Sequence, residues 1–138
     1  MTQGQIKESR GKFKMKKKIL VIDDEELITK SLLRLLSKEG YEVSIARNGS
    51  EAMEIIKDTT FDLIVSDVRM PELDGIETIM QIRAYLKKSN KKPAPEVLIT
   101  GYADAGKYEK AMDLKVADYL YKPFDTAEFV RIIKKTIG

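Results

Sequence analysis

The chain has 138 residues, with 25 Lys and Arg, 22 Asp and Glu, and no histidine, cysteine or tryptophan. A chain of this length forms one domain and buries roughly two-thirds of the surface that its unfolded form exposes. The missing histidine and cysteine exclude Ser-His-Asp and Cys-His catalysis, a phosphohistidine on this chain, and a Cys/His zinc site. Chemistry must therefore come from carboxylates, hydroxyls, tyrosines and lysines, whose oxygen atoms favour hard cations.

Charge is unevenly distributed along the chain. Residues 1–18 carry seven Lys and Arg and one Glu, whereas the remainder has 18 Lys and Arg against 21 Asp and Glu. We expect residues 1–16 to form a basic, disordered tail and residues 17–138 to form the folded domain. Nucleic-acid binding through the tail would need ordered contacts that its composition does not suggest. Because no apolar run reaches the ~20 residues of a membrane span and no signal peptide is visible, a soluble cytoplasmic protein is expected.

Short apolar runs alternate with amphipathic segments along the folded part. Five runs indicate buried strands, at Ile19–Ile22, Val43–Ala46, Leu63–Ser66, Val97–Ile99 and Tyr119–Tyr121. Helical stripes are formed by Leu27, Ile28, Leu32, Leu35 and Leu36, by Ala52, Met53 and Ile56, by Ile76, Ile79, Met80 and Arg83, and by Phe129, Val130, Ile133 and Ile137. A less regular helix is predicted over 105–114. This alternation predicts a doubly wound α/β fold, a parallel sheet with helices on both faces.

Polar residues follow four of the predicted strands. Asp23 and Asp24 come after the first strand, Asp67 after the third, Thr100 after the fourth and Lys122 after the fifth. Ligands of such sheets bind at the carboxyl ends of the strands, so these side chains are expected to converge. Singly, each has an ordinary interpretation as a helix cap, a turn residue or a solvated side chain. Their joint placement favours a functional site.

The three carboxylates predict a cation site. At ~4 Å and an effective dielectric constant near 20, each like-charged pair costs about 4 kcal/mol. A cation or partial protonation must therefore relieve the repulsion, and Mg²⁺ is the natural occupant of an all-oxygen site. A carboxylate, a hydroxyl and a lysine around Mg²⁺ are typical of phosphoryl transfer, as nucleophile, hydrogen-bond donor and counter-charge.

Four sequence segments together resemble the receiver domain of two-component response regulators. They are Val-Ile-Asp-Asp-Glu-Glu at 21–26, Ser-Asp-Val-Arg-Met-Pro-Glu-Leu-Asp-Gly at 66–75, Ile-Thr-Gly-Tyr-Ala at 99–103 and Tyr-Leu-Tyr-Lys-Pro-Phe at 119–124. The resemblance covers about residues 17–138. It implies a flavodoxin-like (βα)5 three-layer sandwich with a parallel sheet of strand order 2-1-3-4-5.

The resemblance also implies roles for individual residues. Asp67 would accept a phosphoryl group from a phosphohistidine of a partner, and Thr100 and Lys122 would bind the phosphoryl oxygens. The Mg²⁺ ligands would be Asp24 and Asp67 directly, Asp23 through water, and the backbone carbonyl of Arg69.

Two further features of the family extend to the last strand. Tyr119, which taken alone is an ordinary core residue, would be the switch aromatic that turns inward as Thr100 moves toward the phosphate. The Lys122–Pro123 peptide would be cis.

The resemblance makes the chain a signalling domain rather than an enzyme, with at most self-phosphotransfer and self-dephosphorylation. Its partner would be a sensor histidine kinase or a histidine phosphotransfer protein, and a homodimer through the face of the fourth helix, fifth strand and fifth helix is compatible with it. Two alternatives stay open. One is a Mg²⁺-dependent phosphohydrolase with an aspartyl nucleophile, and the other is a phosphate-independent interaction module.

Overall fold

Five parallel strands form a single sheet in the computed structural model of the protein, which describes residues 15–70, 73–101 and 113–138. The strand order is β2-β1-β3-β4-β5. The strands are β1 (Lys18–Ile22), β2 (Glu42–Ala46), β3 (Leu63–Asp67), β4 (Glu96–Thr100) and β5 (Asp118–Tyr121). The predicted fold class and strand order are confirmed, and each strand lies within one residue of its predicted ends.

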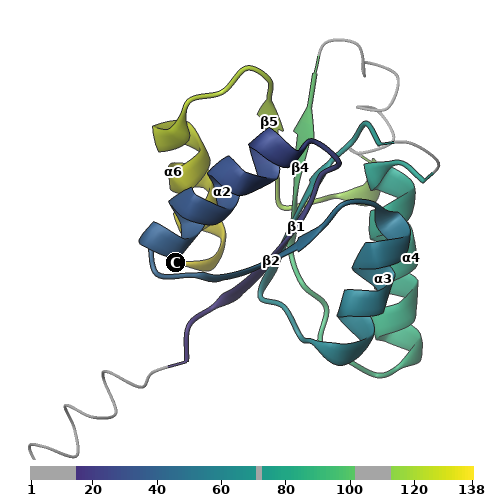
Figure 1. Ribbon diagram of the computed structural model, residues 1–138. Coiled ribbons are helices and arrows are strands. Elements are labelled where there is room, and N and C mark those ends of the chain that lie inside the picture. Colours follow the sequence, from purple (N-terminus) through teal and green to yellow (C-terminus); the bar gives the residue numbers. More distant parts are fainter. Residues whose placement is uncertain (1–14, 71–72, 102–112) are drawn as a thin grey trace, which may run out of the picture.

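Helices cover both faces of the sheet (Figure 1). The helices that lie wholly within the described residues are α2 (Glu26–Lys38), α3 (Gly49–Asp58), α4 (Gly75–Lys88) and α6 (Thr126–Ile137). Helices α2 and α6 pack on one face and α3 and α4 on the other, which gives three layers. The tail predicted over 1–16 lies outside the described residues except for its last two positions, and the helix predicted over 105–114 lies outside them except for its last two.

Side chains directly before three of these helices cap them. The carboxylate or amide oxygens of Asn48, Asp74 and Asp125 accept hydrogen bonds from the backbone N–H three residues later, at 2.8, 2.9 and 2.7 Å. Each bond satisfies an N–H group that the helix itself leaves without a partner, and such a cap is worth about 1 kcal/mol. Helix α2 ends before Gly40, whose φ of 95° is the left-handed conformation that glycine adopts readily.

The hydrophobic core consists of two clusters, one on each side of the sheet. On the α3 and α4 side, Leu20, Ile64 and Leu98 of the strands meet Ile56, Ile79 and Ile82 of the helices. On the α2 and α6 side, Val21, Val65 and Ile99 meet Leu36, Phe129 and Ile133. Strands β1, β3 and β4 are buried on both faces, which explains why their apolar runs are continuous.

Two members of the predicted helical stripes are exposed to solvent. Leu27 is 83% exposed and Met80 is 52% exposed. Each directly adjoins a stripe residue in sequence, Ile28 and Ile79, and successive helical residues point about 100° apart. Their inclusion in the buried stripes was therefore wrong, and Leu27 in particular presents an apolar side chain to solvent.

Gly75 permits a very close approach between the start of α4 and the end of β3. A Cβ atom added at Gly75 would lie 2.1 Å from the backbone oxygen of Asp67. The Gly75 N–H also donates to the backbone oxygen of Val68 at 2.9 Å. The first turn of α4 is thus held directly against the residue that ends β3.

We predict that Gly75→Ala destabilises the fold much more than Gly40→Ala. The first change forces a side chain against backbone that cannot retreat, at an expected cost of about 3 kcal/mol or more. The second introduces only left-handed strain, about 1–2 kcal/mol. Urea unfolding followed by circular dichroism measures both, and equal losses in the two variants would contradict the close packing of α4 on β3.

Candidate functional site

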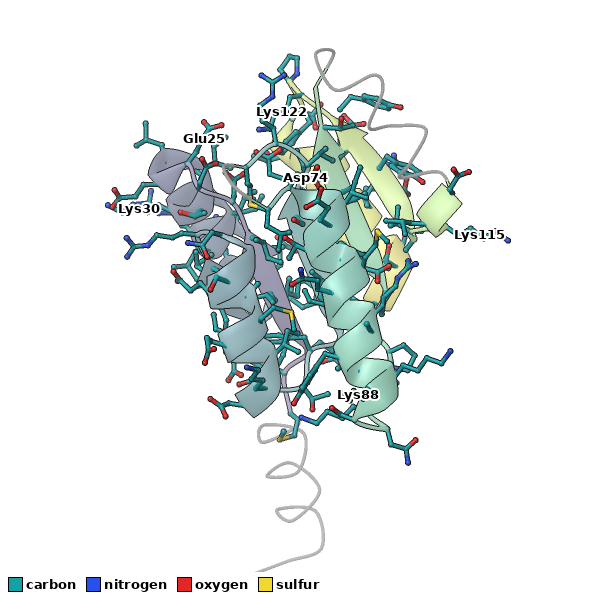
Figure 2. All side chains as sticks on the ribbon, turned by 90° about the vertical axis from the view of Figure 1, so that its right-hand side faces the viewer. Glu25, Lys30, Asp74, Lys88, Lys115 and Lys122 are labelled. Atoms are coloured by element: carbon teal, nitrogen blue, oxygen red, sulfur yellow. The ribbon has the colours of Figure 1, made fainter. Side chains whose placement is uncertain are left out.

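The register of the sheet brings the predicted polar residues to one edge. Ile22 of β1 lies beside Ser66 of β3, so the next residues, Asp23 and Asp67, follow neighbouring strands at the same level. Asp67 in turn lies beside Ile99 of β4, one residue before Thr100. Figure 2 shows Glu25, Asp74 and Lys122 at this end of the molecule, with Lys88 at the opposite end.

Asp67 is almost completely buried and is held on both of its carboxylate oxygens. It is 2% exposed. Its Oδ2 accepts a hydrogen bond from Lys122 Nζ at 3.0 Å, and its Oδ1 accepts one from the backbone N–H of Arg69 at 3.2 Å. Burial raises the pKa of the Asp67 carboxyl, and the favourable contacts with Lys122 and Arg69 offset only part of this rise.

Asp23 is buried beside Asp67 with only one oxygen satisfied. Its Oδ1 accepts a hydrogen bond from the backbone N–H of Glu25 at 2.9 Å. Its Oδ2 is buried and receives no hydrogen bond from any described residue. Burial, reinforced by the negative charge of Asp67, raises the pKa of Asp23 to about 6. A buried carboxylate oxygen without a hydrogen-bond donor is stabilised when it binds a proton or a cation.

Lys122 supplies the positive charge at the site. Besides its bond to Asp67, its ammonium lies 3.6 Å from Glu25 Oε1. Burial lowers the pKa of Lys122, but the hydrogen bond to Asp67 and the charges of Asp67, Asp23 and Glu25 outweigh burial, so the net shift is upward. Lys122 is therefore protonated at neutral pH, and its peptide bond to Pro123 is cis, as predicted.

Three carboxylates in this region could hold a metal ion. One oxygen each from Asp23, Glu25 and Asp67 lies within 4.8 Å of the other two. These hard oxygen donors and the unsatisfied Asp23 Oδ2 fit Mg²⁺. Asp24, predicted as a direct ligand, is exposed and stands outside this group of three, although its charge contributes to the raised pKa of Asp67.

Glu25 is the site residue that the sequence prediction did not include. It precedes the first helical residue of α2, and its backbone turns back onto Asp23. The acidic run after β1 was visible in the sequence, but only the turn geometry shows which of its members faces Asp67.

The two predicted switch residues lie on neighbouring strands. Thr100 is 2% exposed, and its backbone oxygen accepts a hydrogen bond from the Lys122 N–H at 2.8 Å. The Thr100 hydroxyl lies 3.5 Å from the backbone oxygen of Gly101, to which it donates. Tyr119 is half-buried and packs against the core on the α3 and α4 side.

A family comparison identifies the class of protein. The response regulator receiver domain family matches residues 19–134, so the chain belongs to this family, and the predicted resemblance is confirmed. The family is a signalling domain of two-component systems. The structure agrees with the match, because its five-stranded parallel sheet of order β2-β1-β3-β4-β5 superposes on solved receiver proteins.

Individual relatives and structures show the same likeness. The chain is 32% identical over 120 residues to the regulatory protein AtoC of Escherichia coli, covering 87% of this chain and 25% of AtoC. It is 37% identical over 131 residues to hybrid signal transduction histidine kinase B of Dictyostelium discoideum, covering 88% of this chain and 7% of the kinase. The chemotaxis protein CheY4 of Vibrio cholerae superposes with a TM-score of 0.78 at 28% identity, over 88% of this chain and 99% of CheY4.

The chain thus spans about a quarter of the length of AtoC and a smaller part of the kinase. Among the described residues, no helix is long and apolar enough to cross a membrane.

We predict that Asp23→Asn stabilises the protein in the presence of a chelator. The folded-state pKa of Asp23 is about 6, against an ordinary value of 3.8, so the folded protein binds a proton between these values that the unfolded chain does not bind. Wild-type stability should therefore rise as pH falls from 7.5 toward 5. Asp23→Asn should add about 1–2 kcal/mol at pH 7.5 and reduce that pH dependence.

Urea unfolding in EDTA across this pH range measures the effect, with the exposed Asp24→Asn as the matched control. A loss of stability in Asp23→Asn, or an unchanged pH slope, would show that the buried carboxyl is not strained by its surroundings.

Proposed function

We propose that the chain is a Mg²⁺-dependent phosphoacceptor, which takes a phosphoryl group onto Asp67 from a phosphohistidine of a sensor kinase or phosphotransfer protein. The observation that carries this proposal is the bond between Lys122 and Asp67 within a carboxylate cluster, in which Asp23 and Asp67 are buried and Glu25 is exposed. Membership of the receiver family supports it. So does the match to a segment of a protein named as a hybrid histidine kinase.

The transfer itself needs a nucleophile and charge stabilisation. A carboxylate oxygen of Asp67 attacks phosphorus, the P–N bond to the donor imidazole breaks, and the imidazole leaves with the bonding electron pair. The ammonium of Lys122, already 3.0 Å from Asp67, faces the charge that the phosphoryl group brings. Because this chain contains no histidine, the donor must come from another molecule or another part of a longer protein.

The acidic residues around Asp67 would hold the metal ion. In this proposal Asp23, Asp24 and Asp67 are its carboxylate ligands, direct or through water, and Glu25 stands beside them. The peptide of Arg69 adjoins Asp67, which is consistent with a backbone carbonyl ligand. When bound, Mg²⁺ neutralises the crowded carboxylates and the phosphoryl oxygens.

The switch would act through Thr100 and Tyr119. The Thr100 hydroxyl donates to Gly101 at a long distance of 3.5 Å, so a phosphoryl oxygen on Asp67 would offer it a stronger partner. Engagement of Thr100 would favour a second arrangement of the segment between β4 and β5 and of Tyr119. The output face would then include β5 and α6, and a homodimer would form through it.

An apolar groove beside the site fits the phosphodonor. It has a volume of about 570 Å³ and lies between α2 and the loop that follows β5. Its lining includes Leu27, Ile28, Leu35 and Phe124, and Lys122 forms part of its wall. Since Lys122 also contacts Asp67, a protein seated in this groove would have a group within reach of the phosphoacceptor. We assign the groove to an apolar helix of the donor.

The alternative functions have weaker support. Phosphohydrolases with an aspartyl nucleophile use a second acid two residues later, where this chain has Arg69. A phosphate-independent module has no need for a partly buried lysine on a buried aspartate, an arrangement that costs part of the hydration of both groups.

We predict a single phosphoryl adduct when the protein is incubated with Mg²⁺ and acetyl phosphate. Intact-mass spectrometry should show one addition in the wild type, none in Asp67→Asn, and at least about tenfold slower formation in Lys122→Ala, because the counter-charge is lost. Asp62→Asn, an exposed carboxylate at the opposite end of the sheet, serves as the control. Rapid turnover of phosphomonoesters would instead support the hydrolase, and absence of an adduct would support the interaction module.

We predict that Leu27→Ala separates donor docking from chemistry. Phosphotransfer from a phosphorylated histidine kinase domain should slow by about tenfold, as expected for loss of an apolar anchor of about 1–2 kcal/mol. Adduct formation with acetyl phosphate should be unchanged. Met80→Ala, which removes an exposed apolar side chain from the other face, is the matched control. Equal rates for Leu27→Ala and Met80→Ala with the kinase would remove the groove from the proposal.

A further inference from the structure

Arg83 forms a three-way link between α4, β4 and the segment that leads into β5. Its Nε and Nη2 donate to the two carboxylate oxygens of Glu96, each at 2.7 Å. Its Nη1 donates to the backbone oxygen of Leu114 at 2.6 Å. All three hydrogen bonds are short and charge-assisted, and the planar guanidinium holds its partners in a fixed geometry.

Glu96, the partner of Arg83, is a charged residue at a buried position. Glu96 is the first residue of β4, a strand buried along its whole length, and it is 4% exposed. The Glu96 side chain is 5% exposed and that of Arg83 is 35% exposed. Replacing an ion pair that is largely removed from solvent with apolar residues is often neutral or stabilising, so stability alone explains this pair poorly. A role in fixing one arrangement of neighbouring elements explains it better.

The elements that Arg83 joins lead to the two parts of the proposed switch. Helix α4 begins at Gly75, which is packed directly on the backbone of Asp67. On the other side, Leu114 and Tyr119 pack against the same core cluster, only five residues apart in sequence. The Ala117 N–H donates to the Glu96 backbone oxygen at 2.8 Å. The start of β4 is therefore connected to the segment before β5 both by this hydrogen bond and through Arg83.

We propose that Arg83 is a positioning residue of the switch: by holding Leu114, it keeps the segment before β5, and with it Tyr119, in the arrangement described here. This inference rests on the proposed function. In this arrangement the Thr100 hydroxyl is directed to Gly101 rather than to Asp67. The Arg83 link therefore opposes the arrangement in which Thr100 engages a phosphoryl group, and it sets how much of the protein adopts that arrangement.

The protein would divide between two arrangements, one with the Thr100 hydroxyl directed to Gly101 and one with it directed to a phosphoryl group on Asp67. Weakening the link should make the Thr100-engaged arrangement easier to reach, so a phosphoryl mimic on Asp67 should bind more tightly. Coupling through a residue that touches neither ligand nor site is expected to change affinity by roughly 2- to 30-fold.

The experiment measures binding of beryllofluoride in the presence of Mg²⁺ to the full chain, with thermal stability recorded in parallel. Arg83→Lys keeps the charge for Glu96 but cannot make all three contacts. The double variant Arg83→Met with Glu96→Met removes the link and leaves no buried charge, so it is expected to fold even if the single variant does not. Arg34→Lys, on the exposed face of α2, is the matched control.

A second readout follows Tyr119 directly. Tyrosines are labelled with 3-fluorotyrosine, and Tyr119→Phe assigns the fluorine resonance of Tyr119. In both Arg83 variants this resonance should move, without beryllofluoride, part of the way toward its position in the beryllofluoride-bound wild type.

We expect tighter beryllofluoride binding and a shifted Tyr119 resonance in both variants, with Arg34→Lys unchanged. Wild-type affinity and an unmoved Tyr119 resonance in the double variant would overturn the inference, whatever its melting temperature. If the wild type binds no beryllofluoride at Asp67, the proposed function fails and this inference fails with it. Failure of the Arg83 variants alone leaves the phosphoacceptor in place.

Discussion

Two carboxylates buried at one edge of a parallel sheet impose the constraint on which the rest of this structure depends. Asp23 and Asp67 are 1% and 2% exposed, and the charge of Asp67 contributes to the raised pKa of Asp23. Water cannot screen them, so positive charge must be provided locally. Lys122 provides part of it, and the unsatisfied Asp23 Oδ2 leaves room for more. This shortage of positive charge is the physical basis of the proposal that the site binds a cation and that Asp67 accepts a phosphoryl group.

The fold maintains this unfavourable arrangement through backbone geometry. Parallel register fixes Asp23, Asp67 and Thr100 at the ends of adjacent strands, where none can move away without breaking the ladder. Gly75 brings α4 against the backbone of Asp67, and the bond from Lys122 N–H to Thr100 ties the end of β5 to β4. In the proposed switch, a change in charge at Asp67 would act on these rigid neighbours, which lead to Tyr119 and to the link made by Arg83. In this proposal, the packing that holds the carboxylates close together also makes the surrounding structure sensitive to their charge.

Much of this could be predicted from the sequence because the signals are local. Short apolar runs mark the strands and amphipathic stripes mark the helices. A parallel sheet then places the residues that follow its strands at one edge. Features that depend on the turn of a particular loop or helix could not be predicted. Glu25 faces the site because of the backbone turn after β1, and Leu27 points to solvent because it lies beside the buried stripe of α2. The sequence showed Arg83 only as a charged residue within an apolar stripe. Its contact with Glu96 could not be predicted, because Glu96 lies thirteen residues away.

The central claim is that Asp67 is the residue that carries the phosphoryl group, and chemical trapping tests it most directly. Borohydride reduces an aspartyl phosphate to homoserine, which peptide mass spectrometry can locate after treatment with acetyl phosphate and Mg²⁺. The account predicts one modified position, Asp67, with no trapping when EDTA replaces Mg²⁺. Trapping at Asp23, Asp24 or Glu25 in place of Asp67, or equal trapping without Mg²⁺, would contradict it.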